Sequence, residues 1–181
     1  MRLENKVVIV TGAGSGLGKA VSLKIASQGA DLVLADINGE AIAQTAAEVE
    51  AMGRKALQCV VDVCNGESVN KMIADAVAAY GQIHGLVNSA GIFSSIPFLD
   101  LTERDWDRMI NINLKGSFLC AQSFIRQAVE QKTGASIVFL SSISGFIGFT
   151  KSAHYCASKG AVRQLSKAIA LEFGPYGIRS N

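Results

Sequence analysis

Short apolar segments alternate along the chain with longer stretches of helical character. The first of them, Lys6–Val10, is rich in β-branched residues and shows no alternation, which is typical of a strand covered on both faces. Strands are predicted at 6–10, 31–35, 56–61, 83–87 and 136–140. Helices are predicted at 18–28, 40–52, 68–80, 107–131 and 153–173, with Thr102 as a helix cap ahead of the fourth and a break in it near 111–116.

Strands and helices alternate in this order throughout the chain. Repeated βαβ units require right-handed crossovers, and they produce a parallel sheet with helices on both faces. No linker, repeat or low-complexity segment divides the 181 residues. The sequence therefore predicts a single α/β domain over residues 1–181, a doubly wound parallel sheet of Rossmann type.

Composition and charge exclude several classes of protein. Hydrophobic residues make up 49% and charged residues 18%, which excludes a disordered chain. The net charge of +2 comes without any block of basic residues, so no nucleic-acid partner is expected. No apolar run reaches the ~18–20 residues of a membrane span, and the apolar stretch near the start is too short for a signal peptide. A cytoplasmic protein without a membrane partner is expected.

Cysteine and histidine do not form a metal-ligand pattern. The four cysteines include no C-x-x-C pair and have no histidine cluster beside them, so no metal site is predicted. Reduced, mostly buried thiols are expected, with Cys156 as the candidate for incidental reactivity. His84 and His154 are interpreted as packing or surface residues. A G-x-S-x-G elbow is also missing, so a hydrolase has no support.

A glycine-rich turn joins the first predicted strand to the first helix. Backbone N–H groups and the positive dipole end of a helix attract a phosphate at such a place, and glycine lets the backbone approach it. The spacing fits neither the Walker loop nor G-x-G-x-x-G, and reads T-G-x3-G-x-G instead. Alone, such a turn could be purely structural. Its glycines are Gly12, Gly16 and Gly18.

The second predicted strand ends in Asp36, about 20 residues after the glycine turn. In a dinucleotide fold, an acid at this place accepts hydrogen bonds from the adenosine ribose hydroxyls and repels a 2′-phosphate. No arginine stands in the turn or directly after Asp36 to receive such a phosphate. The pattern favours NAD over NADP, although an acid at a strand end can also be merely solvated.

Tyr155 and Lys159 are four residues apart in a predicted helix, so they share one face. A phenol normally keeps its proton up to pH ~10, but an ammonium about 4 Å away in a partly shielded site stabilises the phenolate by about 4 kcal/mol. Beside an oxidised nicotinamide, which is itself cationic, the pair is a candidate proton donor and acceptor for carbonyl chemistry. Alone, a Y-x3-K pair is more typical of a helix surface. Ser141 and Ser142 follow the fifth strand, where a hydroxyl can hydrogen-bond a substrate carbonyl or cap a turn.

Taken together, these motifs resemble those of the short-chain dehydrogenase/reductase family over the whole chain. Ser89 stands where the family has the second asparagine of its N-N-A-G motif. The matches in chain order are the glycine turn Thr11–Gly18, the acid-plus-apolar pair Asp62-Val63, the N-N-A-G segment Asn88–Gly91, Asn113 in an N-x-x-G context, and the serine thirteen residues before Tyr155, which is Ser142 and not Ser141.

The resemblance implies a role for each matching residue. Tyr155 is expected to give or take a proton, while Lys159 favours its ionised form and holds the nicotinamide ribose. Ser142 is expected to polarise the carbonyl, and Asn113 to position a water that links Lys159 to solvent. Hydride is expected to pass directly between NAD and the substrate carbon. The residues expected to bind the cofactor are Gly12, Ser15, Gly16, Leu17, Gly18, Asp36, Ile37, Asp62, Val63, Asn88, Ala90, Gly91, Tyr155 and Lys159.

The resemblance also bears on assembly and on the C-terminal end. Family members commonly pair through the helices predicted at 107–131 and 153–173, so a homo-oligomer, a dimer or a tetramer, is expected. The chain stops at Ile178–Asn181, where the pattern calls for another buried strand. The family's later P-G turn, substrate loop and final strand have no counterpart. We therefore expect a domain cut short, without its last strand or strands and its substrate loop.

Three functions stay open. The first is an NAD-dependent dehydrogenase or reductase of a small secondary alcohol, polyol or ketone. The second is a 3-oxoacyl-thioester reductase, and the third is an NAD-binding module without turnover in this shortened form. Apolar residues after the fourth and fifth strands suggest an apolar substrate wall, namely Ile92, Phe93, Ile96, Pro97, Phe98, Ile143, Phe146 and Phe149.

Overall fold

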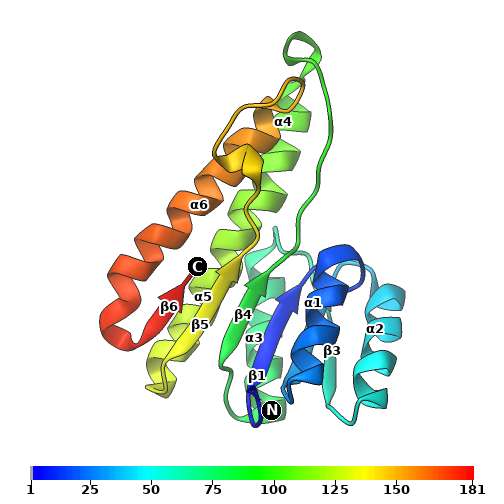
Figure 1. The fold of residues 1–181 in the computed structure, drawn as a ribbon, viewed down its shortest axis with the longest axis vertical. Helices are drawn as coiled ribbons and strands as arrows, with labels where there is room; N and C mark the ends of the chain where they lie inside the picture. Colours follow the sequence, from blue (N-terminus) through cyan, green and yellow to red (C-terminus); the bar gives the residue numbers. More distant parts are fainter. Residues whose placement is uncertain (1) are drawn as a thin grey trace.

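The structure, a computed structural model that describes residues 2–181, contains a six-stranded sheet in which every neighbouring pair is parallel. The strand order is β3-β2-β1-β4-β5-β6 (Figure 1). The order reverses between β1 and β4, and the carboxyl ends of strands at such a point are where open α/β sheets bind ligands. The strands are β1 (Val7–Thr11), β2 (Asp31–Asp36), β3 (Ala56–Val60), β4 (Gly85–Asn88), β5 (Ala135–Phe139) and β6 (Ile178–Ser180).

Helices cover both faces of the sheet, as the alternating pattern predicts (Figure 1). One face carries α3, α5 and α6, whose buried residues join Ile137 of β5 in one hydrophobic cluster. The other face carries α1 and α2, which pack mainly over β1 and β2. Val138 of β5 points to this second face and is 38% exposed. The helices are α1 (Gly16–Ser27), α2 (Gly39–Ala51), α3 (Gly66–Tyr80), α4 (Glu103–Ile110), α5 (Gly116–Gln131) and α6 (Ala153–Phe173).

The predicted elements are present, and α6 has the predicted bounds. The fourth predicted helix differs, because it begins earlier, at Glu103. Thr102 caps it there by accepting a hydrogen bond from the Asp105 N–H at 3.1 Å. No break occurs near 111–116: the helix continues through a π-helical turn, Asn111–Lys115, which joins α4 to α5. Near the C-terminal end, β6 pairs with β5, with Ile178 opposite Ala135.

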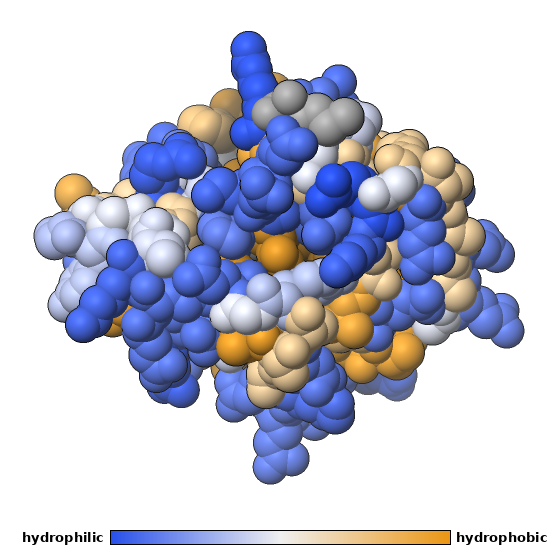
Figure 2. Space-filling model, turned by 90° about the horizontal axis from the view of Figure 1, so that it is seen from below, coloured by the Kyte–Doolittle hydropathy of each residue, from blue (hydrophilic) through white to orange (hydrophobic). Residues whose placement is uncertain are grey.

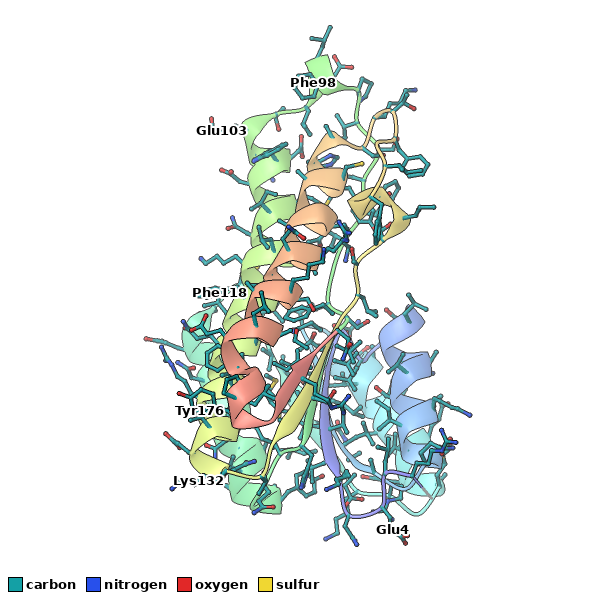
Figure 3. All side chains as sticks on the ribbon, turned by 60° about the vertical axis from the view of Figure 1, so that its left-hand side comes forward. Glu4, Phe98, Glu103, Phe118, Lys132 and Tyr176 are labelled. Carbon is teal, nitrogen blue, oxygen red and sulfur yellow. The ribbon has the colours of Figure 1, made fainter. Side chains whose placement is uncertain are left out.

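The carboxyl ends of the strands face the part of the molecule formed by α4, the start of α6 and two long loops (Figure 1). Phe98 marks the tip of this part in Figure 3, whereas Glu4 and Lys132 lie at the opposite end. The surface at that opposite end is mostly hydrophilic (Figure 2). The residues predicted to carry chemistry follow the strand ends, so they gather on the side of the tip.

Candidate active site

A cavity of about 590 Å³ opens at the carboxyl ends of the strands. Segments after β1, β2, β3, β4 and β5 form its wall together with α4 and α6. Every residue predicted to bind the cofactor is part of this wall except Asn88. The predicted members present are Gly12, Ser15, Gly16, Leu17, Gly18, Asp36, Ile37, Asp62, Val63, Ala90, Gly91, Tyr155 and Lys159.

The glycine turn has a backbone path that side chains would block. Gly12 has a φ of +68°, and a Cβ on it would come within 2.9 Å of the Ala90 backbone. A Cβ on Gly18 would overlap the carbonyl of Gly12, so glycine is needed for α1 to start this close to the turn. Gly16 has a φ of +52° with open space beside it. A bare turn that is open on its outer side fits the close approach of a phosphate.

The N-terminus of α1 keeps its donors available. Ser15 is the N-cap residue, but its side chain makes no capping hydrogen bond within residues 2–181. The first turn of α1 also contains no acidic residue. The first N–H groups and the positive end of the helix dipole are therefore free to meet an anion in the cavity.

The carboxylate of Asp36 braces the glycine turn. Its Oδ2 accepts a hydrogen bond from the Gly14 N–H at 3.0 Å, and its Oδ1 accepts one from the Asn38 N–H at 3.1 Å. A Cβ on Gly14 would lie 2.7 Å from the Ala41 Cβ, so the turn passes close to α2. Asp36 is half-buried and lines the cavity. Each carboxylate oxygen keeps a lone pair with which it can accept from a ribose hydroxyl.

Of the predicted cofactor-binding residues after β3 and at the end of β4, those after β3 line the cavity and the one at the end of β4 does not. Asp62 and Val63 line the cavity, and Val63 fits against Gly116, where a Cβ would lie 2.8 Å from the Val63 Cγ2. Asn88 is 4% exposed, and neither polar atom of its side chain has a hydrogen-bond partner within residues 2–181. Because Asn88 is buried and is not part of the cavity wall, its contact with a cofactor stays a prediction.

Tyr155 and Lys159 both line the cavity from α6. Lys159 is buried, and its Nζ donates a hydrogen bond to the Leu140 carbonyl at 2.6 Å. The same Nζ lies 5.8 Å from the centre of the Tyr155 ring. Burial lowers the pKa of Lys159 below its usual value, because low-dielectric surroundings disfavour the ammonium. The two side chains meet as their spacing predicts.

Asn113 lies in the π-helical turn with its side chain buried. Its Oδ1 accepts from the Ile92 N–H at 2.8 Å, and its Nδ2 donates to the Ile92 carbonyl at 3.0 Å. Nδ2 also donates to the Ser158 Oγ at 3.1 Å. The amide thus fixes the segment after β4 beside α6. The predicted positioning of a water is a role beyond these contacts and stays a prediction.

The two serines after β5 differ in how their hydroxyls are used. Ser141 lines the cavity, and its Oγ donates to the Lys159 carbonyl at 2.9 Å. Ser142 caps a 3-10 turn, Ile143–Gly145, because its Oγ accepts from the Ser144 N–H at 3.1 Å. Ser142 is half-buried and is not part of the cavity wall. The turn cap considered for a serine at this place is therefore present, and the catalytic role of Ser142 stays a prediction.

Four residues of the cavity wall were not predicted from the sequence, and a sequence pattern indicates only two of them. Arg108 and Ile112 are four residues apart, directly before Asn113, so their spacing places them on one helical face beside a predicted site residue. Of the predicted apolar wall, Ile92 and Phe93 line this cavity. The missed residues are Val61, Arg108, Ile112 and Leu140.

Residues 2–181 contain no cluster of three histidine, cysteine, aspartate or glutamate residues placed to hold a metal ion. Within the same residues, no helix is both long and apolar enough to cross a bilayer. The four thiols are free, and burial raises the pKa of Cys59 to about 11 and that of Cys120 to about 12.

A glycine turn, an acid at the end of β2 and a Tyr–Lys pair in one cavity are the arrangement expected of a nicotinamide-dependent oxidoreductase. The family model for short chain dehydrogenases matches residues 6–181. The chain therefore belongs to the short-chain dehydrogenase/reductase family, whose members are oxidoreductases that bind a nicotinamide cofactor.

Individual relatives support the assignment. The chain is 37% identical to the (2S)-[(R)-hydroxy(phenyl)methyl]succinyl-CoA dehydrogenase subunit BbsD of Thauera aromatica, over 100% of this chain and 72% of that protein. It is 38% identical to the 3-oxoacyl-[acyl-carrier-protein] reductase FabG of Thermotoga maritima, over 100% and 73%. A crystal structure of a short chain dehydrogenase from Mycobacterium paratuberculosis bound to NAD superposes with a TM-score of 0.97 at 31% identity, over 100% of this chain and 72% of that one.

Proposed function

We propose that the protein is an NAD-dependent dehydrogenase or reductase that interconverts a small secondary alcohol or polyol and the corresponding ketone. One observation carries the proposal: Tyr155 and Lys159 line the same cavity as the glycine turn and Asp36. A proton-transfer pair that shares a cavity with a dinucleotide cradle supports the coupled transfer of a proton and a hydride to one substrate.

The cradle suits NAD in shape and in charge. The bare turn and the N-terminus of α1 suit the pyrophosphate, and Asp36 suits the adenosine ribose. Asp62 and Val63, which line the cavity, are proposed to border the adenine, and Tyr155 and Lys159 are proposed to hold the nicotinamide ribose. The charge of Asp36 disfavours a 2′-phosphate, which supports NAD over NADP. When bound, the nicotinamide supplies the acceptor or the donor of the hydride.

Tyr155 is proposed to move the proton. In reduction its hydroxyl donates the proton to the substrate oxygen, and in oxidation its phenolate takes the proton back from the alcohol. The Lys159 ammonium stabilises the phenolate. Because burial lowers the pKa of Lys159, this lysine also releases a proton to the phenolate more readily than an exposed lysine would. Asn113 is proposed to hold the segment around Ile92 beside this pair, and to position the water that links Lys159 to solvent.

Ser142 is proposed to hydrogen-bond the substrate oxygen. Its Oγ accepts a hydrogen bond from the Ser144 N–H, so its own O–H is left free to donate to a carbonyl. The O–H of Ser141, in contrast, is already donated to the Lys159 carbonyl. The hydrogen bonding therefore favours Ser142 over its neighbour for this role.

The substrate end of the site is apolar. Ile92 and Phe93 line the cavity next to Tyr155, whose ring centre lies 5.0 Å from that of Phe93. Ile143 and Phe146 are each 65% exposed in the segment after β5. Such surroundings support a substrate with apolar substituents on the reacting carbon.

A 3-oxoacyl-thioester reductase is the second candidate. The Thermotoga maritima relative carries that activity in its name, and the Thauera aromatica relative is named as the dehydrogenase of a CoA thioester. The apolar wall also suits an acyl chain. An acyl-thioester substrate set beside simple ketones discriminates the two candidates.

A homo-oligomer is proposed as the working assembly. A second cavity of about 580 Å³ lies between α5 and α6, and Phe118, whose position on α5 is visible in Figure 3, is part of it. Arg126, Glu130 and Glu172 bring both signs of charge to this apolar surface. A face of this kind can be complementary to itself across a twofold axis.

Calorimetric titration with NADH and then NADPH, followed by a turnover screen on the same sample, tests the proposal. Tight NADH binding with weak NADPH binding and NADH-dependent reduction of a ketone are the expected results. NADH binding without turnover of ketones or acyl thioesters would indicate an NAD-binding module instead. A folded sample that binds neither nucleotide would contradict the proposed cradle.

A further inference from the structure

His154, the residue before Tyr155, is fully buried at 0% exposure. Its Nε2 lies 2.8 Å from the Oγ of Ser94, within hydrogen-bond distance. Its Nδ1 is buried and has no partner within residues 2–181. An unpartnered buried nitrogen costs free energy that an apolar side chain of similar size would avoid. Packing alone therefore does not account for histidine at this position, and its bond to Ser94 is the polar contact that needs an explanation.

The Ser94–His154 bond stands directly beside a contact of the candidate active site. Phe93 and Ser94 are consecutive in the loop after β4, and His154 and Tyr155 are consecutive at the start of α6. The rings of Phe93 and Tyr155 meet edge to face, with their centres 5.0 Å apart and their planes at 84°. Each of two consecutive loop residues therefore contacts one of two consecutive helix residues.

Hydrogen bonds attach the same loop on both sides of this pair. Ahead of it, the side-chain amide of Asn113 holds the N–H and carbonyl of Ile92. Beyond it, the Ile96 N–H donates to the Lys151 carbonyl at 2.8 Å. Residues 89–97 contain no helix or strand, so these attachments decide where the loop lies. Figures 1 and 3 both show the chain running from β4 to the tip near the N-terminal turns of α6.

We propose that the Ser94–His154 hydrogen bond holds Phe93 against Tyr155 and thereby sets which substituents of a carbonyl substrate the site accepts. The inference rests on the proposed function, because it places Phe93 at the substrate end of that site. Phe93 lines the cavity and is 62% exposed, so one side of its ring is free to meet a substrate. A ring fixed beside the proposed proton donor limits the bulk on one side of the reacting carbon. Ser94 and His154 are positioning residues that act through Phe93.

Four variants separate this role from general packing. Ser94→Ala removes the hydroxyl partner and leaves the buried histidine in place. His154→Phe keeps a buried ring without a polar edge, and His154→Gln replaces the imidazole by a side-chain amide that can also bond to Ser94. Ser95→Ala is the matched control, since Ser95 is an exposed neighbour in the same loop. Ser94→Ala keeps the test valid even where His154→Phe fails to fold.

The first readout is hydrogen exchange of the Ile96 amide in the protein without substrate. Losing one hydrogen bond next to this attachment should speed its exchange by about five- to tenfold in Ser94→Ala and His154→Phe. The rate should stay close to that of the wild type in His154→Gln and Ser95→Ala. Exchange in Ser94→Ala as slow as in the wild type overturns the anchoring role, and this outcome does not depend on turnover.

The second readout is the ratio of kcat/KM for acetophenone to that for 2-butanone, with NADH as the reductant. Ser94→Ala should change this ratio by about fivefold or more, through KM as well as kcat, while NADH affinity stays constant. An unchanged ratio together with faster exchange overturns the assignment of Phe93 to selectivity. A wild type that reduces no carbonyl compound overturns the proposed function instead, and the exchange rates still decide the contact.

Discussion

The Nζ of Lys159 donates a hydrogen bond to the Leu140 carbonyl at 2.6 Å and lies 5.8 Å from the centre of the Tyr155 ring. The carbonyl of Lys159 in turn accepts a hydrogen bond from Ser141. The lysine is therefore held at its main chain and at its ammonium by the segment that follows β5. This double attachment fixes α6 against the strand end, so the proposed proton-transfer pair has a defined place in the cavity.

Replacing Lys159 by methionine should change how stability depends on pH. Burial lowers the pKa of this lysine, so between the lowered pKa and the ordinary ~10.4 the unfolded chain binds more protons than the folded one. Across that window the free energy of unfolding of the wild type should therefore contain a contribution that rises with pH. Lys159→Met should lack this contribution. Urea unfolding at several pH values measures the difference, with the exposed Lys167→Met as the control. Parallel pH profiles for wild type and Lys159→Met would count against a buried ammonium.

Removing the charge of Asp36 should weaken the preference for NAD. Asp36→Asn keeps an acceptor oxygen but loses the stronger hydrogen bonds of a carboxylate, so NADH affinity should fall by about tenfold. The discrimination against NADPH should narrow at the same time. Energy transfer from Trp106, the single tryptophan, to bound NADH gives the affinities, and Glu40→Gln is a control in the first turn of α2. If Asp36→Asn discriminates between NADH and NADPH as strongly as the wild type, Asp36 does not bind the adenosine ribose.

Adding a methyl group to Gly18 should disrupt the turn. The Cβ in Gly18→Ala would overlap the Gly12 carbonyl, and relief of such a clash typically costs about 1–3 kcal/mol. NADH binding should be lost together with that stability. Gly66→Ala is the matched control, because it also lies at the start of a helix and its Cβ would meet nothing closer than Leu119 at 3.9 Å. Equal effects at the two glycines, by thermal unfolding and titration, would speak against the close approach.

The face between α5 and α6 should carry self-association. Phe118 is 40% exposed there, and Phe118→Asp places a charge on the apolar surface. The wild type should sediment as a multiple of the 19.0 kDa chain, and Phe118→Asp should shift toward the monomer. Met52→Asp, at an exposed position at the C-terminal end of α2, should not. A monomeric wild type over a wide concentration range would contradict the proposed assembly.

The regular elements and the shape of the glycine turn were predictable from the sequence because their signals are local. The apolar periodicity of α6 and the spacing of Gly12 and Gly18 require no knowledge of distant residues. Tyr155 and Lys159 meet because four residues make about one turn of a helix. The strand ends share one edge of the sheet because the strands are parallel, so Asp36 could be placed beside the turn.

The loops could not be predicted in the same way, because their positions depend on partners far away in sequence. Ser142 is predicted to be the catalytic serine because it lies thirteen residues before Tyr155 in the sequence, as in the family. In the structure its hydroxyl also caps a turn, and no local sequence pattern shows the shape of that turn. His154 reads as a packing residue, and its bond to Ser94 joins positions 60 residues apart. Arg108 reaches the cavity wall because α4 packs against α6, a contact that no local pattern in the sequence shows.

Kinetics of Tyr155→Phe test the central claim most directly. The substitution keeps the ring that meets Phe93 and removes the hydroxyl that is proposed to carry the proton. With Tyr176→Phe as an exposed control, NADH affinity should fall by no more than about tenfold, which corresponds to one lost hydrogen bond to the nicotinamide ribose, while NADH-dependent ketone reduction should fall by about 10²–10⁴-fold. Ketone reduction at the wild-type rate by Tyr155→Phe, with NADH bound, would show that another group transfers the proton.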